Sequence, residues 1–171
     1  MSTLHYRYAG LPDQQLLAQL YRQLIEEHAD TGEAELPRLL RRVRQWLSRG
    51  YRAVLFESAA GETLAYALFR EHHREIYLRQ FLVLPQARRH GVGRQAMDLL
   101  RGRIWPAGKR LTVEVMTSNP DGYRFWHAMG YRDCAVTLEI PGLGNGDSGI
   151  AHAGKVLAVA NPDSRVPIPA R

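Results

Sequence analysis

The chain has a single cysteine, Cys134, among its 171 residues. One cysteine cannot form an internal disulfide or a cysteine-only metal site, and it is typical of a protein from a reducing compartment. The seven histidines form no H-E-x-x-H pattern, and the chain contains no C-x-x-C pair. Because neither zinc-binding pattern occurs, we expect no metal.

Long hydrophobic runs are also missing. No stretch approaches the roughly 18 apolar residues of a membrane helix, and the N-terminus lacks the apolar core of a signal peptide. The 45% of hydrophobic and 23% of charged residues are ordinary for a globular protein. We therefore expect one cytoplasmic domain with its own core and no membrane partner.

Acidic residues are the minority: 17 against 23 basic ones give a net charge of +6. Such a charge permits nucleic-acid binding. However, the basic residues are spread along the whole chain and no nucleic-acid motif accompanies them, so a nucleic-acid partner is disfavoured. Arginines on one face of the predicted helix 36–47 are most simply a solvated surface.

The most informative stretch is 76–104. An apolar, β-branched and aromatic run from Ile76 to Leu84 predicts a buried strand, which Pro85 ends. Apolar residues at helical spacing then predict a helix that opens at Gly91-Val-Gly93. A helix N-terminus offers unpaired N–H groups, and glycines let an anion approach them. With the charges of Arg88, Arg89 and Arg94 added, this loop is predicted to hold a phosphate group.

Two motifs compete for this loop. Gly91–Ala96 fits the dinucleotide fingerprint G-x-G-x-x-G/A, with Glu114 about twenty residues on. Against it, six residues separate the strand from the first glycine, and Glu114 lies inside its predicted strand. The alternative is R/Q-x-x-G-x-G/A at Arg88–Gly93, preceded by Val83-Leu-Pro85. That run resembles the coenzyme A pyrophosphate loop of the GNAT superfamily of N-acetyltransferases.

The predicted elements support this resemblance. Strands are expected at 4–8, 51–57, 63–70, 76–84, 111–116 and 131–140, and helices from Leu11, at 36–47, after Gly93 and at 119–129. This is the order of the GNAT fold, which implies an α/β (α+β) domain over 1–140. Its sheet would be mixed and mostly antiparallel, of about six to seven strands, with helices on both faces. Residues 141–171 read as a Gly/Pro-rich tail, with a possible short strand at 154–160.

A second motif adds site residues. Asn119, Phe125-Trp126 and Gly130-Tyr131 look like the family pattern N-x-x-A-x-x-F-Y-x-x-x-G-F. The resemblance implies acetyl-CoA as co-substrate, and an amine that attacks the thioester directly while main-chain N–H groups polarise its oxygen. The coenzyme-binding residues that it implies are Phe81, Leu82, Val83, Arg88, Arg89, His90, Gly91, Val92, Gly93, Arg94, Asn119 and Trp126.

Trp126 departs from the pattern, since family members often have a tyrosine there as general acid, and Gly122 replaces an alanine. An indole cannot deliver a proton at neutral pH. Three alternatives stay open. A thiol of pKa about 8.5 leaves without an acid, Tyr123 one turn earlier substitutes, or catalysis is lost. The last would make the chain a non-catalytic acyl-CoA-binding module.

The amine must also lose a proton, because an alkylamine has a pKa of about 10.4. Glu114 is the candidate base: a carboxylate between Val113 and Val115 in a strand expected to be central, where an unpaired charge is costly. Its alternative role is a structural salt bridge, with Arg79 or Gln80 on the preceding strand as possible polar partners.

The acceptor is expected to be a primary amine on a small molecule or a peptide. Five carboxylates lie within residues 26–35, in a connection that the resemblance places at the acceptor side. They favour a cationic acceptor; the alternative is an acidic loop that pairs with the arginine face of helix 36–47. The sequence leaves a homodimer open.

Overall fold

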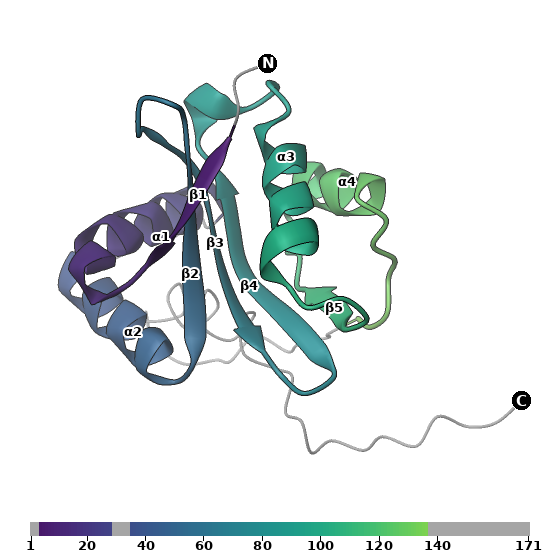
Figure 1. The fold of residues 1–171 in the computed structure, drawn as a ribbon, viewed down its shortest axis with the longest axis horizontal. Coiled ribbons are helices and arrows are strands. Elements are labelled where there is room, and N and C mark those ends of the chain that lie inside the picture. The colour runs from purple at the N-terminus through teal and green to yellow at the C-terminus, as the bar shows by residue number, and fades with distance from the viewer. Residues whose placement is uncertain (1–3, 29–34, 137–171) are drawn as a thin grey trace, which may run out of the picture.

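The computed structural model describes residues 4–28 and 35–136 (Figure 1). The strands are β1 (His5–Ala9), β2 (Tyr51–Glu57), β3 (Thr63–Glu71), β4 (Glu75–Val83) and β5 (Arg110–Val113). The α-helices are α1 (Gln14–His28), α2 (Leu36–Ser48), α3 (Val92–Leu99) and α4 (Pro120–Ala128). Short 3-10 turns η1 (Leu11–Asp13) and η2 (Pro85–Ala87) precede α1 and α3, and a π-helical turn, η3 (Leu100–Ile104), continues α3.

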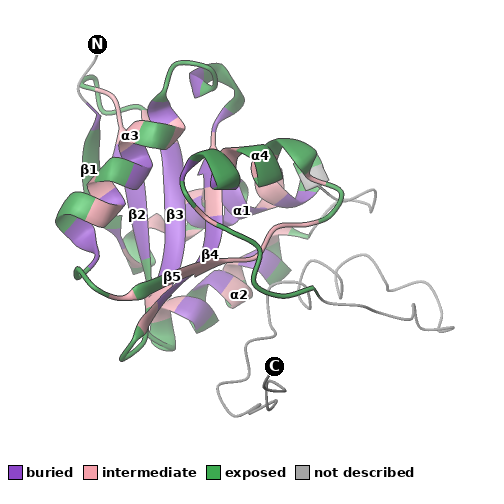
Figure 2. Cartoon of the chain, turned by 90° about the vertical axis from the view of Figure 1, so that its right-hand side faces the viewer, coloured by how far each residue is buried: buried purple, intermediate pink, exposed green. Residues whose placement is uncertain are grey.

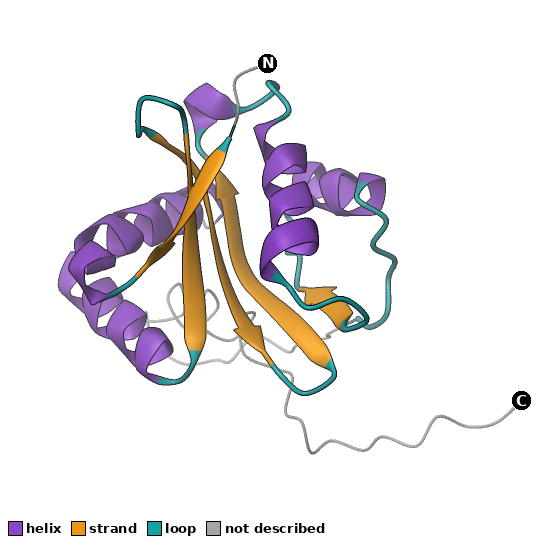
Figure 3. Ribbon diagram, viewed as in Figure 1, coloured by secondary structure: helices purple, strands orange, loops and turns teal. Residues whose placement is uncertain are grey.

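The strands form one sheet in the order β1-β2-β3-β4-β5. All neighbours are antiparallel except β4 and β5, which are parallel (Figure 3). The predicted mixed, mostly antiparallel sheet is thus confirmed. It also argues against the dinucleotide fingerprint, which requires a mainly parallel sheet.

The helices cover both faces of this sheet. Helices α1 and α2 pack on one face, and α3 and α4 lie on the other (Figure 1). Each face has its own core, because side chains alternate along the strands. Val54 and Phe56 of β2 belong to the α3 side, whereas Ala53 and Leu55 belong to the α1–α2 side. Figure 2 shows the central strands as almost continuously buried.

Strand β4 is irregular at one residue. Gln80 pairs with Leu68 and Leu78 pairs with Phe69, so Arg79 has no partner position on β3. This β-bulge breaks the alternation of side chains, and Arg79 and Gln80 both contact residues of the α1–α2 side. Both side chains are buried.

Two predicted strands are wrong in part. The predicted strand 111–116 ends as β5 at Val113, at the edge of the described sheet, so Glu114 follows an edge strand and is not in a central one. Residues 131–136 form no strand: Tyr131 packs on Trp126 with ring centroids 5.1 Å apart, and 132–136 are exposed. The described sheet therefore has five strands where about six to seven were expected. Residues 137–140, the tail 141–171 and its possible strand lie outside the described residues.

Candidate active site

The predicted phosphate loop joins β4 to α3. Its backbone has a positive φ angle at two residues: Arg89 has φ 64°, and Gly91, the N-cap of α3, has φ 76°. Only glycine adopts the left-handed region without strain. The first N–H groups of a helix, here those of Val92, Gly93 and Arg94, have no intrahelical acceptor, and Gly91 has no side chain to cap them. They are therefore available to an anion.

The two glycines of the loop have different roles. A Cβ added at Gly93 would lie 3.1 Å from Phe125 Cε2 and 3.3 Å from Val83 Cγ2, so this glycine lets α3 pack closely on β4 and α4. A Cβ at Gly91 would meet only Gln95 Nε2, at 3.9 Å. Gly91 is thus required by its positive φ, and the space beside it is open.

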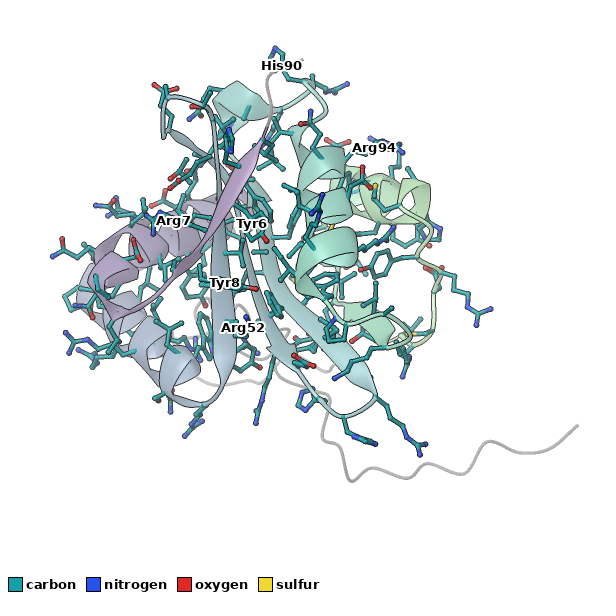
Figure 4. All side chains as sticks on the ribbon, in the orientation of Figure 1. Tyr6, Arg7, Tyr8, Arg52, His90 and Arg94 are labelled. Carbon is teal, nitrogen blue, oxygen red and sulfur yellow. The ribbon has the colours of Figure 1, made fainter. Side chains whose placement is uncertain are left out.

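The basic side chains of the loop also differ from one another. The Arg88 Nε donates to the Val83 carbonyl at 2.8 Å, and its Nη2 pairs with Glu27 Oε2 of α1 at 2.5 Å. Arg88 therefore ties the loop to the end of β4 and to the other side of the sheet. Exposed side chains next to the helix N-terminus come from Arg89, His90 and Arg94; Figure 4 labels the last two.

The other half of the site is the part of β4 that extends beyond its pairing with β5. The ladder between β4 and β5 stops at Leu78 and Val113, whereas β4 continues to Val83. Along Arg79–Val83, β4 has no strand on its β5 side within the described chain. From there the chain continues through η2 to the N-terminus of α3.

The predicted coenzyme contacts Phe81 and Trp126 lie in one aromatic cluster beside this part of β4. The Trp126 ring lies 5.4 Å from that of Phe81 and 5.0 Å from that of Phe125. The Phe81 and Phe125 rings are stacked at 5.8 Å. Trp126 is buried, so it packs α4 onto β4, and Leu82 is buried on the α1–α2 side. A ligand would meet the backbone of these β4 residues.

Asn119 caps α4. Its Oδ1 accepts from the Gly122 N–H at 2.8 Å. A Cβ at Gly122 would lie 2.4 Å from Asn119 Nδ2, so a larger residue would displace the cap.

Glu114 lies where β4 and β5 separate. It is partly buried, and the Tyr77 hydroxyl donates to its Oε2 at 3.2 Å. Burial raises the pKa of Glu114, while the Tyr77 hydrogen bond and the charge of Arg79 act in the opposite direction. Among the described residues Glu114 forms no ion pair within 4.0 Å, so the alternative role, a structural salt bridge, finds no partner there.

The two polar neighbours on β4 are engaged on the α1–α2 side. The Arg79 guanidinium stacks 4.7 Å from the Trp46 ring centroid and lies 3.5 Å from the Tyr51 hydroxyl. The Gln80 Oε1 accepts from Tyr66 at 3.0 Å. The bulge thus places a buried polar cluster beside Glu114. Sequence reasoning missed Tyr77 and the bulge; two adjacent polar residues inside an apolar strand were the available signal.

Tyr123 lies apart from that cluster, on the exposed side of α4. Its hydroxyl donates to Asp133 Oδ2 at 2.5 Å, and the same carboxylate contacts His127 Nε2 at 3.0 Å. The hydrogen bond to Asp133 raises the pKa of Tyr123. A phenol held in this way releases its proton less readily than a free one.

The described residues contain no group of three or more His, Cys, Asp or Glu that could hold a metal ion. Within 4–28 and 35–136, no helix is long and apolar enough to cross a membrane.

Comparison with known structures shows the same fold in many proteins. A possible acetyltransferase from Clostridium difficile 630 matches with a TM-score of 0.65 and 13% identity, over 83% of this chain and 99% of the other. The aminoglycoside N-acetyltransferase AAC(6')-Iy in complex with CoA matches at 0.64 and 14%, over 84% and 97%. A predicted acetyltransferase with acetyl-CoA from Clostridium acetobutylicum matches at 0.62 and 18%, over 81% and 96%.

Sequence comparison supplies the family. No curated protein sequence matches significantly. The profile of the acetyltransferase (GNAT) family matches residues 17–131, from within α1 to just past α4, and so includes the loop, β4 and Glu114. The chain belongs to the acetyltransferase (GNAT) family, whose members use acetyl-CoA.

Proposed function

We propose that this protein is an N-acetyltransferase that transfers the acetyl group of acetyl-CoA to a primary amine. The observation that carries the proposal is the meeting of two backbone surfaces. One is the N-terminus of α3, which Gly91 leaves open, and the other is the β4 edge beyond Leu78. Together they suit a ligand with a phosphate end and an amide-containing arm.

The residues of the loop fit a pyrophosphate. The N–H groups of Val92, Gly93 and Arg94 point along the helix axis toward the space beside Gly91. Arg89, His90 and Arg94 are exposed there and can contribute charge. Arg88 instead holds the loop in place through Glu27 and Val83.

The β4 edge would bind the pantetheine arm through main-chain groups. Because the Val83 carbonyl already accepts from Arg88, we assign the arm mainly to the backbone of Phe81 and Leu82. Asn119 and Trp126 would support the site indirectly. Asn119 fixes the start of α4 and Trp126 fixes its packing on β4.

Glu114 is proposed as the base. Bound acetyl-CoA supplies an activated acetyl group as a thioester. The Glu114 carboxylate takes a proton from the amine, whose nitrogen forms the new bond to the acetyl carbon as the carbon–sulfur bond breaks. A pKa raised by burial makes this carboxylate a better proton acceptor than an exposed one. The Tyr77 hydroxyl orients it.

The thiolate is proposed to leave without help from Tyr123. A thiol of pKa about 8.5 is a tolerable leaving group near neutral pH. The Tyr123 proton is directed to Asp133, on the exposed side of α4. These contacts favour the first of the three alternatives that the sequence leaves open.

The hypothesis of a cationic acceptor has less support from the structure than from the sequence. Of the five carboxylates in 26–35, Glu26 pairs with Arg22 and Glu27 pairs with Arg88. Asp30 and Glu33 lie outside the described residues. We therefore keep a primary amine as the acceptor class, with a cationic acceptor as the subset to test first.

The direct test is consumption of the acetyl-CoA thioester against a panel of neutral, cationic and acidic amines. We expect amine-dependent release of free thiol and a mass-spectrometric acetyl adduct on the amine. If acetyl-CoA binds in calorimetry but no amine is acetylated, the chain is the non-catalytic acyl-CoA-binding module instead.

A further inference from the structure

Helix α2 carries a second basic region, far from the phosphate loop. A hollow of about 870 Å³ lies between its outer face and the start of α1. The hollow is lined by Arg38, Arg41, Arg42 and Arg44, together with Gln14 and Gln45. We call it the α2 hollow. It lies across the sheet from α3, because α2 packs in the core of the α1–α2 side (Figure 1).

The arginines of the α2 hollow have few internal partners. The Arg44 Nε donates to Gln14 Oε1, and the Arg42 guanidinium lies 5.9 Å from the Trp46 ring centroid. Among the described residues none of the four forms an ion pair with a carboxylate. Helix α2 itself contains no acidic residue.

The described carboxylates of η1 and α1 form ion pairs elsewhere. Asp13, just before α1, pairs with Arg7 of β1. Glu26 and Glu27, at the far end of α1, pair with Arg22 and Arg88. Glu35, the N-cap of α2, is exposed and forms no ion pair within the described chain. Of the acidic segment 26–35, Glu26 and Glu27 therefore do not pair with this face, and Asp30 and Glu33 lie outside the described residues.

This arrangement is costly for the helix alone. Arg38 and Arg41, Arg41 and Arg44, and Arg38 and Arg42 stand three or four residues apart, a spacing at which like charges destabilise a helix. Buried Leu39, Val43 and Trp46 on the opposite face hold α2 in place despite this repulsion. An anion in the α2 hollow would remove the repulsion.

We propose that the α2 hollow binds a small anion with several phosphate groups, such as a triphosphate. Its lining supplies planar guanidinium groups that match phosphate bidentately, and carboxamides as additional donors. The hollow is open to solvent, and the Arg38, Arg41 and Arg44 side chains in it are exposed and accessible to an anion. The four arginines lie within two turns of one helix, a short span that fits a short polyphosphate better than the long regular backbone of a duplex. This proposal does not depend on the acetyl-transfer function.

The test is calorimetric titration of the full chain with inorganic triphosphate and with ATP, with and without saturating CoA to occupy the α3 loop. The site variant is Arg38→Gln, Arg41→Gln and Arg44→Gln, which spares Arg42 because of its contact with Trp46. The control variant removes the same charge at exposed positions elsewhere, by Arg74→Gln, Arg103→Gln and Arg132→Gln.

We expect the site variant to weaken triphosphate binding at least about tenfold and the control variant to change it less than about twofold, with CoA affinity unchanged in both. Binding of inorganic triphosphate and ATP alike means that the phosphates suffice; binding of ATP alone means that the nucleoside contributes. Equal losses in both variants, or no triphosphate binding by the unmodified chain, would overturn the proposal. So would a labelled duplex oligonucleotide that binds through these arginines while triphosphate does not.

Discussion

The loop 88–94 and helix α2 are the two arginine-rich stretches of this protein, and they use their charges differently. In the loop, the Arg88 side chain bonds to Glu27 and to the Val83 carbonyl, and the anion site is made by backbone N–H groups next to Gly91. In α2 the backbone is fully helical, and it is the arginine side chains that bring positive charge to the hollow.

This difference shows why basic residues alone identify a site poorly. A guanidinium on a surface helix is free to move and is screened by salt. A helix N-terminus held open by a glycine in the left-handed region is already arranged for an anion before it binds. We therefore expect the affinity for CoA to depend on the loop and not on the arginines of α2.

The largest effect is expected outside both stretches, at Glu114. Glu114→Gln should lower kcat on the order of a hundredfold or more, since it removes the proposed base, while calorimetric CoA affinity stays the same. Asp121→Asn, at an exposed carboxylate of α4, is the matched control and should be silent. A Glu114→Gln enzyme with normal kcat would exclude Glu114 as the base.

Glu114→Gln should also affect stability, in the direction opposite to its effect on kcat: it lowers activity but should stabilise the fold. The folded pKa of Glu114 is raised, so its contribution to stability is present below its unfolded pKa and is lost as pH rises through the folded pKa. Glu114→Gln should therefore raise Tm at neutral pH and not at pH 4, by differential scanning calorimetry. A uniform loss of Tm would show a purely structural role.

The next effect separates the two arginine-rich stretches. Arg88→Glu with Arg89→Glu should weaken CoA binding by about tenfold to a hundredfold, through repulsion of the phosphates and release of the loop from Glu27. Arg38→Glu with Arg41→Glu changes the net charge equally and should leave CoA affinity within about twofold. Similar losses in the two variants would mean that net charge, and not the loop, attracts the coenzyme.

A smaller effect is expected at Tyr77. Its hydrogen bond favours the ionised form of Glu114, so Tyr77→Phe should raise the pKa of Glu114 further. The base acts only when ionised. The acid limb of the pH profile of kcat/KM should therefore move to higher pH, with the plateau nearly unchanged; an unshifted limb would assign it to another group.

The smallest effect is expected at Tyr123. Tyr123→Phe should leave kcat within about threefold, because its hydroxyl is bonded to Asp133 on the surface of α4. Loss of a general acid would cost about a hundredfold. A drop of that size, with an unchanged melting curve, would make Tyr123 the acid. Trp126→Tyr should not accelerate turnover if no acid is needed.

Local patterns were sufficient to predict β4, the loop and α3. The apolar run to Leu84, Pro85 and the helical spacing after Gly93 depend only on neighbouring residues, and the structure has β4 at Glu75–Val83 and α3 from Val92. The same holds for the β2–β3 hairpin and for α4 with its cap at Asn119.

The parts that were not predicted depend on distant partners. Residues 111–116 are apolar enough for a strand, but β5 pairs with β4 only as far as Val113. Where that pairing ends depends on how the two strands meet in space, which the local sequence does not indicate. Arg88 bonds to Glu27, 61 residues away, which no local pattern indicates. The bulge at Arg79 places that side chain against Trp46 of α2, a contact between residues far apart in the sequence.

The central claim, that the N-terminus of α3 binds the pyrophosphate of CoA, is tested most directly by two glycine variants. Gly91→Val and Gly61→Val place the same side chain at similar backbone angles, φ 76° and 82°, and neither Cβ would meet an atom closer than 3.9 Å. Both should lose similar stability. In calorimetry, Gly91→Val should weaken CoA binding at least about tenfold, whereas Gly61→Val, in the β2–β3 turn, should bind CoA as the unmodified protein does. Unchanged CoA affinity in Gly91→Val would contradict the account.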